Sequence, residues 1–230
     1  MLTSADGTRF AAFVARAERP SGAGVVVLPD VRGLFRFYEE LAMRFAEEGI
    51  NAVAIDYFGR TAGVAKRGEE FPYMEYVPLT KAQEIADDTR AAVTYLRSAD
   101  GGACRSVFTI GFCFGGSNSW LQAAAGHGLA GAIGFYGRPG PGRDGSPGPA
   151  ARAGEMTCPV LALMGGADQG IPAEQIEELR TAFQKAGLEH EVVVYEGAPH
   201  SFFDRSYEQH AEASADAWRR SLAFVRSHTQ

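Results

Sequence analysis

Residues 107–125, VFTIGFCFGGSNSWLQAAA, hold an apolar run, a glycine-rich turn and a segment able to form a helix. The turn, GFCFG at 111–115, has the form G-x-nucleophile-x-G, with Cys113 where serine is usual. In so tight a strand-to-helix turn, a Cβ at either flanking glycine position would collide with neighbouring backbone. The pattern therefore predicts that the Cys113 sulfur projects from a sheet and faces the N-terminus of the next helix.

Further apolar runs recur on both sides of this turn, at intervals that leave room for a helix between them. They lie at residues 10–15, 25–29, 52–55, 132–136, 159–164 and 192–195. Runs that are apolar on both faces are typical of parallel strands covered by helices. Helical spacing of apolar residues separates them, at 37–45, 85–96, 176–183 and 218–225. This alternation predicts a three-layer α/β/α sandwich with a mostly parallel sheet.

Length and composition indicate one domain, residues 1–230, because 230 residues with 46% hydrophobic content suffice for one large core. Two segments interrupt the alternation. Residues 59–80 form a long connection, and residues 137–155 are too rich in glycine and proline for a helix or a central strand. We expect the second segment to be a lid, a binding loop or a mobile insertion, or else a solvated loop without a role.

Charge and cysteine content exclude several classes of protein. A net charge of −6 argues against nucleic acid or an anionic membrane as partner. Three cysteines do not make a disulfide framework and fit a reducing compartment. The chain has no apolar run of about 18 residues and no signal-like segment near residue 1. We therefore expect a cytoplasmic protein, monomeric or forming a small homo-oligomer.

A thiol in this turn needs a base to act as a nucleophile. An ordinary thiol is only about 3% ionised at pH 7, and half-ionisation requires about 2 kcal/mol, whereas a helix N-terminus supplies about 0.3–1 kcal/mol. Asp168 follows the run at 159–164, and His200 follows the run at 192–195. Both residues, like Cys113, then lie at the carboxyl edge of a parallel sheet, where open α/β sheets place their sites. We expect His200 to take the thiol proton and Asp168 to orient the imidazole.

Simpler interpretations of the same residues remain open. Cys113 could be a small buried apolar residue, Asp168 could cap a helix that starts near Ala173, and His200 could be an ordinary loop histidine. Cys104 and Cys158 stand at strand starts, away from the carboxyl edge, and are interpreted as structural.

These motifs resemble the dienelactone hydrolase family of α/β hydrolases. The likeness extends from residue 8 to 226 and rests on four segments: GFCFGG around Cys113, LMGGAD ending at Asp168, GAPHSFFD around His200, and LAMRFAEEGINAVAIDYFGR at 41–60. The resemblance implies an α/β-hydrolase fold without a large cap domain and a Cys113–His200–Asp168 triad. It also implies hydrolysis of an enol-lactone or related small ester, with no metal and no organic cofactor.

The resemblance implies roles for residues near the nucleophile as well. In the family, a glutamate after the second strand lies beside the thiol and accepts its proton when substrate arrives. Here the matching acid is Asp30, one methylene shorter, which could instead cap the following turn. The N–H of Val31, by the same alignment, and the N–H of Phe114, after the nucleophile, are the expected oxyanion donors.

Substrate contacts follow less directly from the resemblance. The family binds a substrate carboxylate through arginines, and Arg205 lies one position beyond the family spacing; a surface ion pair would explain it too. Arg60 and Arg67 are the candidates for a second arginine. Tyr136 and Phe135 could line the pocket, and core packing explains them equally well.

The expected activity is therefore cleavage of a small enol-lactone or ester through a thioester acyl-enzyme. Two alternatives stay open: a broader carboxylesterase or thioesterase on the same triad, and a non-catalytic binding protein that uses the 137–155 loop as an interaction surface.

Overall fold

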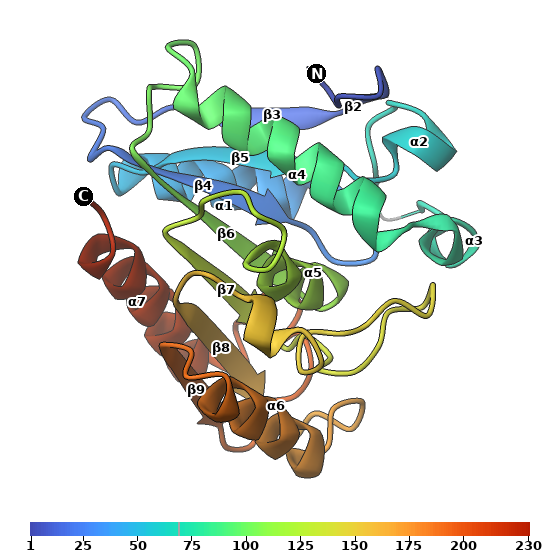
Figure 1. Ribbon diagram of the computed structural model, residues 1–230, viewed down its shortest axis with the longest axis vertical. Helices are drawn as coiled ribbons and strands as arrows, with labels where there is room; N and C mark the ends of the chain where they lie inside the picture. Colours follow the sequence, from blue (N-terminus) through green and yellow to red (C-terminus); the bar gives the residue numbers. More distant parts are fainter. Residues whose placement is uncertain (69) are drawn as a thin grey trace.

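A mixed sheet forms the centre of the fold in the computed structural model, which describes residues 1–68 and 70–230 (Figure 1). Its strand order is β3-β5-β4-β6-β7-β8-β9, and only β3 runs antiparallel to its neighbour. The strands are β3 (Ala12–Ala15), β4 (Ala23–Leu28), β5 (Asn51–Ile55), β6 (Ser106–Phe112), β7 (Gly131–Phe135), β8 (Val160–Gly165) and β9 (His190–Tyr195). Each apolar run of the sequence contributes one of these strands, so the predicted α/β class is confirmed.

A small antiparallel pair, β1 (Leu2–Thr3) and β2 (Arg9–Phe10), precedes the sheet and has no counterpart among the predictions. The apolar run at 10–15 is divided between β2 and β3. A two-residue strand carries too few residues to show a periodic pattern, and for that reason the sequence gives no sign of β1.

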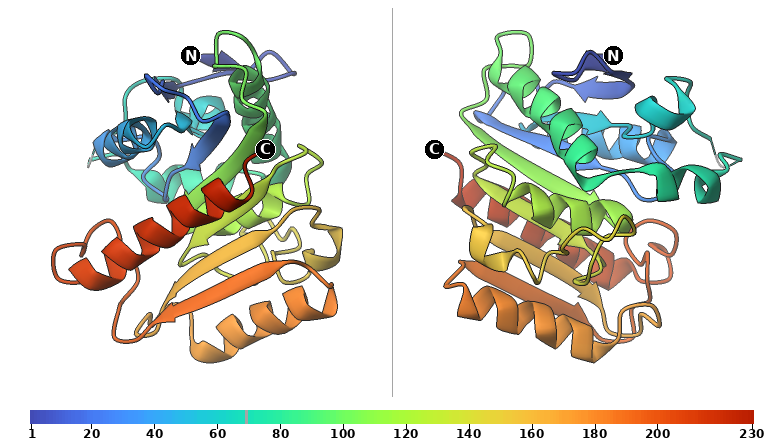
Figure 2. Two further views of the ribbon diagram at one scale, coloured as in Figure 1. Left: turned by 90° about the vertical axis from the view of Figure 1, so that its left-hand side faces the viewer. Right: turned by 45° about the vertical axis from the view of Figure 1, so that its right-hand side comes forward.

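Helices cover both faces of the sheet and form the two outer layers of the sandwich. Figure 2 shows α1 and α7 on one face and α4, α5 and α6 on the other. Their bounds are α1 (Arg36–Glu47), α4 (Ala82–Arg97), α5 (Phe114–Gln122), α6 (Ala173–Lys185) and α7 (Ala211–Ser227). Phe45 of α1 packs on Trp218 of α7 with ring centres 4.7 Å apart. All four predicted helical patterns lie inside these helices.

Burial explains the continuous apolar runs. Every residue of β4, β5, β6, β7 and β8 is buried, whereas the edge strands β3 and β9 are partly exposed. The inner strands therefore have helices on both faces, which is the arrangement that removes any need for polar alternation.

The two irregular segments contain little regular structure. Residues 59–80 include α2 (Gly59–Ala62), α3 (Tyr73–Tyr76) and the 3₁₀ turn η1 (Val77–Leu79). The 137–155 loop contains only the 3₁₀ turn η2 (Ala153–Glu155) in the described chain, at its very end. No helix in the described ranges combines the length and apolarity that a membrane crossing requires.

Hydrogen bonds hold the 137–155 loop at several points, including the following. Ser117 Oγ of α5 donates to the carbonyl of Arg138 at 3.0 Å. Within the loop, the N–H of Ala150 donates to Pro139 at 3.1 Å. At the tip, Asp144 Oδ2 accepts from the N–H of Ala82, the first residue of α4, at 3.0 Å. The loop is thus held at Arg138, between Pro139 and Ala150, and at Asp144.

The connections define where a site can form. β4 leads into α1 on one face, and β6 leads into α5 on the opposite face, although β4 and β6 are neighbours. The chain therefore leaves the sheet in opposite directions at these two strand ends, and a crevice opens between them. At the crevice, a Cβ on Gly115 would lie 2.1 Å from the Leu28 carbonyl oxygen and 2.3 Å from that of Pro29.

We expect Gly115→Ala to destabilise the protein by about 1–3 kcal/mol or more, because the new methyl group would meet backbone that cannot move aside. Urea unfolding of the variant measures the change. Gly154→Ala serves as the control, since no atom lies within 4 Å of its Cβ position. Equal stabilities of the two variants would contradict the expectation.

Candidate active site

The turn after β6 holds Cys113 in a strained conformation. Its φ is 55° and its ψ is −113°, in the left-handed half of the map that residues other than glycine seldom enter, and it is the N-cap of α5. The N–H of Cys113 donates to the carbonyl of Phe135 at 3.0 Å, which ties the turn to β7. A strained residue at a strand-to-helix turn is the conformation expected of a nucleophile elbow.

Asp168 and His200 come together from the loops after β8 and β9. Asp168 Oδ2 lies 2.6 Å from His200 Nδ1, and its Oδ1 accepts from the N–H of Gly170 at 2.8 Å. Because a carboxylate can only accept, Nδ1 carries a proton, and Nε2 is the ring nitrogen that Asp168 does not engage. Asp168 does not cap α6, because the N-cap of that helix is Pro172. The structure thus brings together the acid and the imidazole named by the sequence.

The environment of His200 favours its protonated form. Burial opposes the charge, but hydrogen bonds with Asp168 and with Cys113, together with their negative charges, raise the pKa of His200 to about 10. The ring of Tyr136 packs beside the imidazole, with centres 5.0 Å apart. A strongly basic imidazole that contacts the sulfur is suited to take its proton.

Two residues whose amides were expected to bind an oxyanion line the same cavity. Val31, in the turn after β4, and Phe114, the first residue of α5, both line the cavity that contains Cys113. Within the described chain neither N–H has a hydrogen-bond acceptor. Unpaired amides on both sides of a nucleophile are the donors that an oxyanion would need.

This cavity has a volume of about 530 Å³. It is lined on one side by the elbow and the His200 loop, and on the other by the 137–155 loop, which supplies Arg138 and Arg143. Leu121, Pro141 and Ile171 give it an apolar part. A larger hollow of about 870 Å³ lies between β3 and α1, but it contains none of the three triad candidates. The long loop is therefore a wall of the candidate site.

Of the two aromatic candidates for substrate contact, only Tyr136 lines the cavity. Phe135 is fully buried and stacks between Phe112 and Phe203, with ring centres 4.7 Å from each. Tyr136 is fully buried as well, but it follows β7 with a positive φ of 37° and belongs to the cavity lining.

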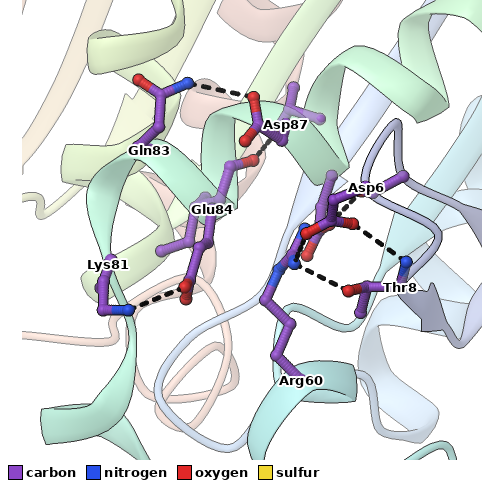
Figure 3. A network of polar contacts seen from close by, with 11 residues as sticks. Asp6, Thr8, Arg60, Lys81, Gln83, Glu84 and Asp87 are labelled. Atoms are coloured by element: carbon purple, nitrogen blue, oxygen red, sulfur yellow. Dashed lines mark hydrogen bonds and ion pairs between the residues drawn. The ribbon is translucent and has the colours of Figure 1, made fainter.

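The arginines named from the resemblance lie outside the cavity lining. Arg205 is exposed. Arg60 forms ion pairs with Asp6 and Asp88, as part of the polar network that holds the N-terminal hairpin against α4 (Figure 3). Arg67 is buried against Asp56 at 2.8 Å. Of the three arginines suggested for substrate binding, Arg60 and Arg67 pair with carboxylates outside the cavity. Arg205 also lies outside the cavity lining.

Asp30 is buried, and both of its carboxylate oxygens bind Arg32. Its Oδ1 also accepts from the backbone N–H of Arg32 at 2.8 Å, so it caps the following turn, as one of the two interpretations of the sequence expected. The sequence could not indicate the side-chain pairing, because residues two apart in an irregular turn have no fixed side-chain relationship. Arg32, Arg138 and Arg143 are the site residues that sequence reasoning missed.

Comparison with known proteins agrees with this arrangement. The profile described as "Dienelactone hydrolase family" matches residues 10–229. The chain belongs to the dienelactone hydrolase family. As a member of it, the protein is an enzyme, a dienelactone hydrolase-like hydrolase with an α/β-hydrolase fold.

Individual relatives give the same assignment. A Yersinia pestis protein named "Putative carboxymethylenebutenolidase" is 31% identical, covering 96% of this chain and 85% of its own. A Salmonella typhimurium protein of the same name is 33% identical over 94% of this chain and 82% of its own. The crystal structure named "Putative Dienelactone Hydrolase" from Klebsiella pneumoniae is 28% identical, with a TM-score of 0.86 over 98% of this chain and 97% of that one.

We expect Asp168→Asn to reduce the pH dependence of stability. His200 has an ordinary pKa of 6.5 and a folded pKa of about 10, so its protonation stabilises the fold fully below pH 6.5 and ceases to do so as the pH rises through about 10. Without the Asp168 carboxylate, the pKa of His200 in the folded protein falls. The protein then loses less stability as the pH rises from 6.5 to 10. Urea unfolding at pH 6.5 and pH 10 measures it, with the exposed Asp100→Asn as control. An unchanged difference between the two pH values would show that Asp168 does not raise the pKa.

Proposed function

We propose that the protein hydrolyses small carboxylic esters and lactones, enol-lactones among them, with Cys113 as the nucleophile. The observation that carries the proposal is the 2.6 Å contact between Asp168 and the His200 ring, which interacts with the Cys113 sulfur at a strained turn. Family membership supports the reaction class. The relatives' name, carboxymethylenebutenolidase, supports a lactone as one substrate.

The reaction follows from these positions. The Cys113 sulfur attacks the carbonyl carbon while His200 holds the thiol proton, and the amides of Phe114 and Val31 stabilise the oxyanion. The C–O bond then breaks, the departing oxygen takes the proton from His200, and a thioester remains on Cys113. Water, deprotonated by His200, attacks the thioester and releases the acid and the thiol.

The leaving group decides how well a thiol performs this reaction. An enolate or an aryl oxide departs readily, whereas an amide nitrogen must be protonated first, so esters with acidic alcohols suit a cysteine nucleophile. A cavity of about 530 Å³ accommodates a small substrate. Thioesters meet the same chemical requirement and form the second candidate class.

The charge on the cavity wall supports a preference among these esters. Arg138 and Arg143 line the cavity from the 137–155 loop, and the acidic side chain in its lining, Asp168, is already bound to His200. These two arginines stand in place of the three that the resemblance suggested. We propose that they favour substrates with a carboxylate remote from the scissile bond.

Removal of the nucleophile tests the reaction directly. We expect Cys113→Ala to lower the hydrolysis of 4-nitrophenyl acetate and of cis-dienelactone at least about 10⁴-fold, as for other triad nucleophiles, and His200→Ala to lower it strongly. Cys158→Ala is the matched control and should retain the wild-type rate, because burial raises the pKa of the Cys158 thiol to about 12. Full activity in Cys113→Ala would end the proposal.

A pair of esters that differ only in charge tests the cavity wall. We expect Arg138→Ala and Arg143→Ala each to lower kcat/KM for mono(4-nitrophenyl) succinate about two- to fivefold, the size of an exposed charge pair, and to leave its methyl ester unaffected. Arg205→Ala, outside the cavity lining, is the control. Equal effects on the charged and the neutral ester would reject an electrostatic role for these arginines.

A further inference from the structure

The turn at residues 30–33, which carries the Val31 amide, is held by one guanidinium. Arg32 Nε lies 3.1 and 2.9 Å from the two carboxylate oxygens of Asp30, and Arg32 Nη2 also pairs with Oδ2. The backbone N–H of Arg32 donates to Asp30 Oδ1 at 2.8 Å. Because a guanidinium presents its donors in a rigid plane, these contacts fix the carboxylate and the intervening backbone together.

Backbone contacts complete the turn on both sides of Val31. The carbonyl oxygen of Asp30 accepts from the N–H of Gly33 at 3.1 Å and from the hydroxyl of Tyr57 at 2.6 Å. The N–H of Asp30 donates to the hydroxyl oxygen of Tyr38 at 3.0 Å. The polar groups around Val31 are therefore occupied, whereas its own N–H is directed to no acceptor in the described chain and Val31 lines the cavity.

Arg32 also reaches the loop that carries His200. Its Nη2 lies 3.8 Å from Asp204 Oδ2, in a side chain that is 2% exposed, and its Cζ lies 4.3 Å from the centre of the Phe35 ring. Burial and the negative charge of Asp30 raise the pKa of Asp204 to about 6, so Asp204 is mostly ionised at pH 7. Arg32 is thus the cation between two buried carboxyl groups, one on the oxyanion turn and one four residues after His200.

We propose that Arg32 is a positioning residue for hydrolysis: it fixes the 30–33 turn so that the Val31 N–H points at the oxygen where negative charge develops. The inference rests on the proposed mechanism. It gives Asp30 a task besides that of the thiol-proton acceptor expected from the resemblance, because both of its oxygens bind Arg32. Since the oxyanion forms only after substrate is bound, a displaced donor should affect kcat more than KM.

Arg32→Ala separates this role from that of the triad. Loss of one oxyanion donor lowers kcat about 10²- to 10³-fold in other hydrolases, so a misplaced donor should lower kcat for 4-nitrophenyl acetate by at least about tenfold, with KM changed by less than about threefold. Alkylation of Cys113 by iodoacetamide passes through no oxyanion. Its limiting rate at high pH should therefore stay within about twofold of wild type.

Two further variants keep the test decisive if Arg32→Ala leaves unpaired buried carboxylates and folds poorly. Arg32→Lys keeps the charge without the planar fork, and Arg32→Ala combined with Asp30→Asn removes the charge imbalance; both should fold and still show the loss of kcat. Arg36→Ala, an exposed arginine nearby, is the matched control.

The results distinguish three situations. Wild-type kcat in the double variant would overturn the proposal, because stability alone would then explain the arginine. Alkylation lost in step with hydrolysis would overturn it as well, since Arg32 would act on the thiol. Failure of Cys113→Ala to lower hydrolysis would instead reject the proposed function itself.

Discussion

The approach of α5 to the end of β4 is the constraint on which the candidate site depends. The backbone at Gly115 lies so close to the Leu28 carbonyl oxygen that a Cβ there would be 2.1 Å from it. To pass this point, the chain must reverse within one residue after β6, and Cys113 takes up the resulting strain at φ 55°. The same approach brings the start of α5 next to the turn after β4, so that residues from two separate elements, Phe114 and Val31, line the cavity that contains Cys113.

Backbone proximity also unites the other two loops of the site. A Cβ on Gly165, at the end of β8, would lie 2.6 Å from the carbonyl oxygen of Ala198, and the N–H of Ala167 donates to that oxygen at 3.0 Å. The loops that carry Asp168 and His200 are therefore joined by backbone contacts as well as by the contact between the two side chains. Gly165 thus allows the two loops that carry the proposed acid and imidazole to touch at the edge of the sheet.

The sequence predicted what depends on periodicity and on short motifs. Continuous apolar runs locate the inner strands, and the glycine pattern around Cys113 locates the elbow. What it could not predict depends on contacts without a fixed spacing. The Arg32–Asp30 pair lies in an irregular turn, and Arg143 lies in a loop whose path is set by the distant bond between Asp144 and Ala82. Arg205, one position beyond the family spacing, was the candidate after His200, but it is exposed.

The groups proposed for bond cleavage and those proposed for substrate choice differ in how they are held. Cys113, Asp168 and His200 lie on turns that continue buried strands or are joined to them by backbone contacts, so their positions follow from the core. Arg138 and Arg143 lie on a glycine- and proline-rich loop that hydrogen bonds to Ser117, Ala82 and Ala124 fasten to the rest of the chain. A change in that loop can alter the cavity wall without disturbing the sheet. On the proposed function, strand ends fix the residues of the chemistry, whereas a loop carries the residues proposed to select the substrate.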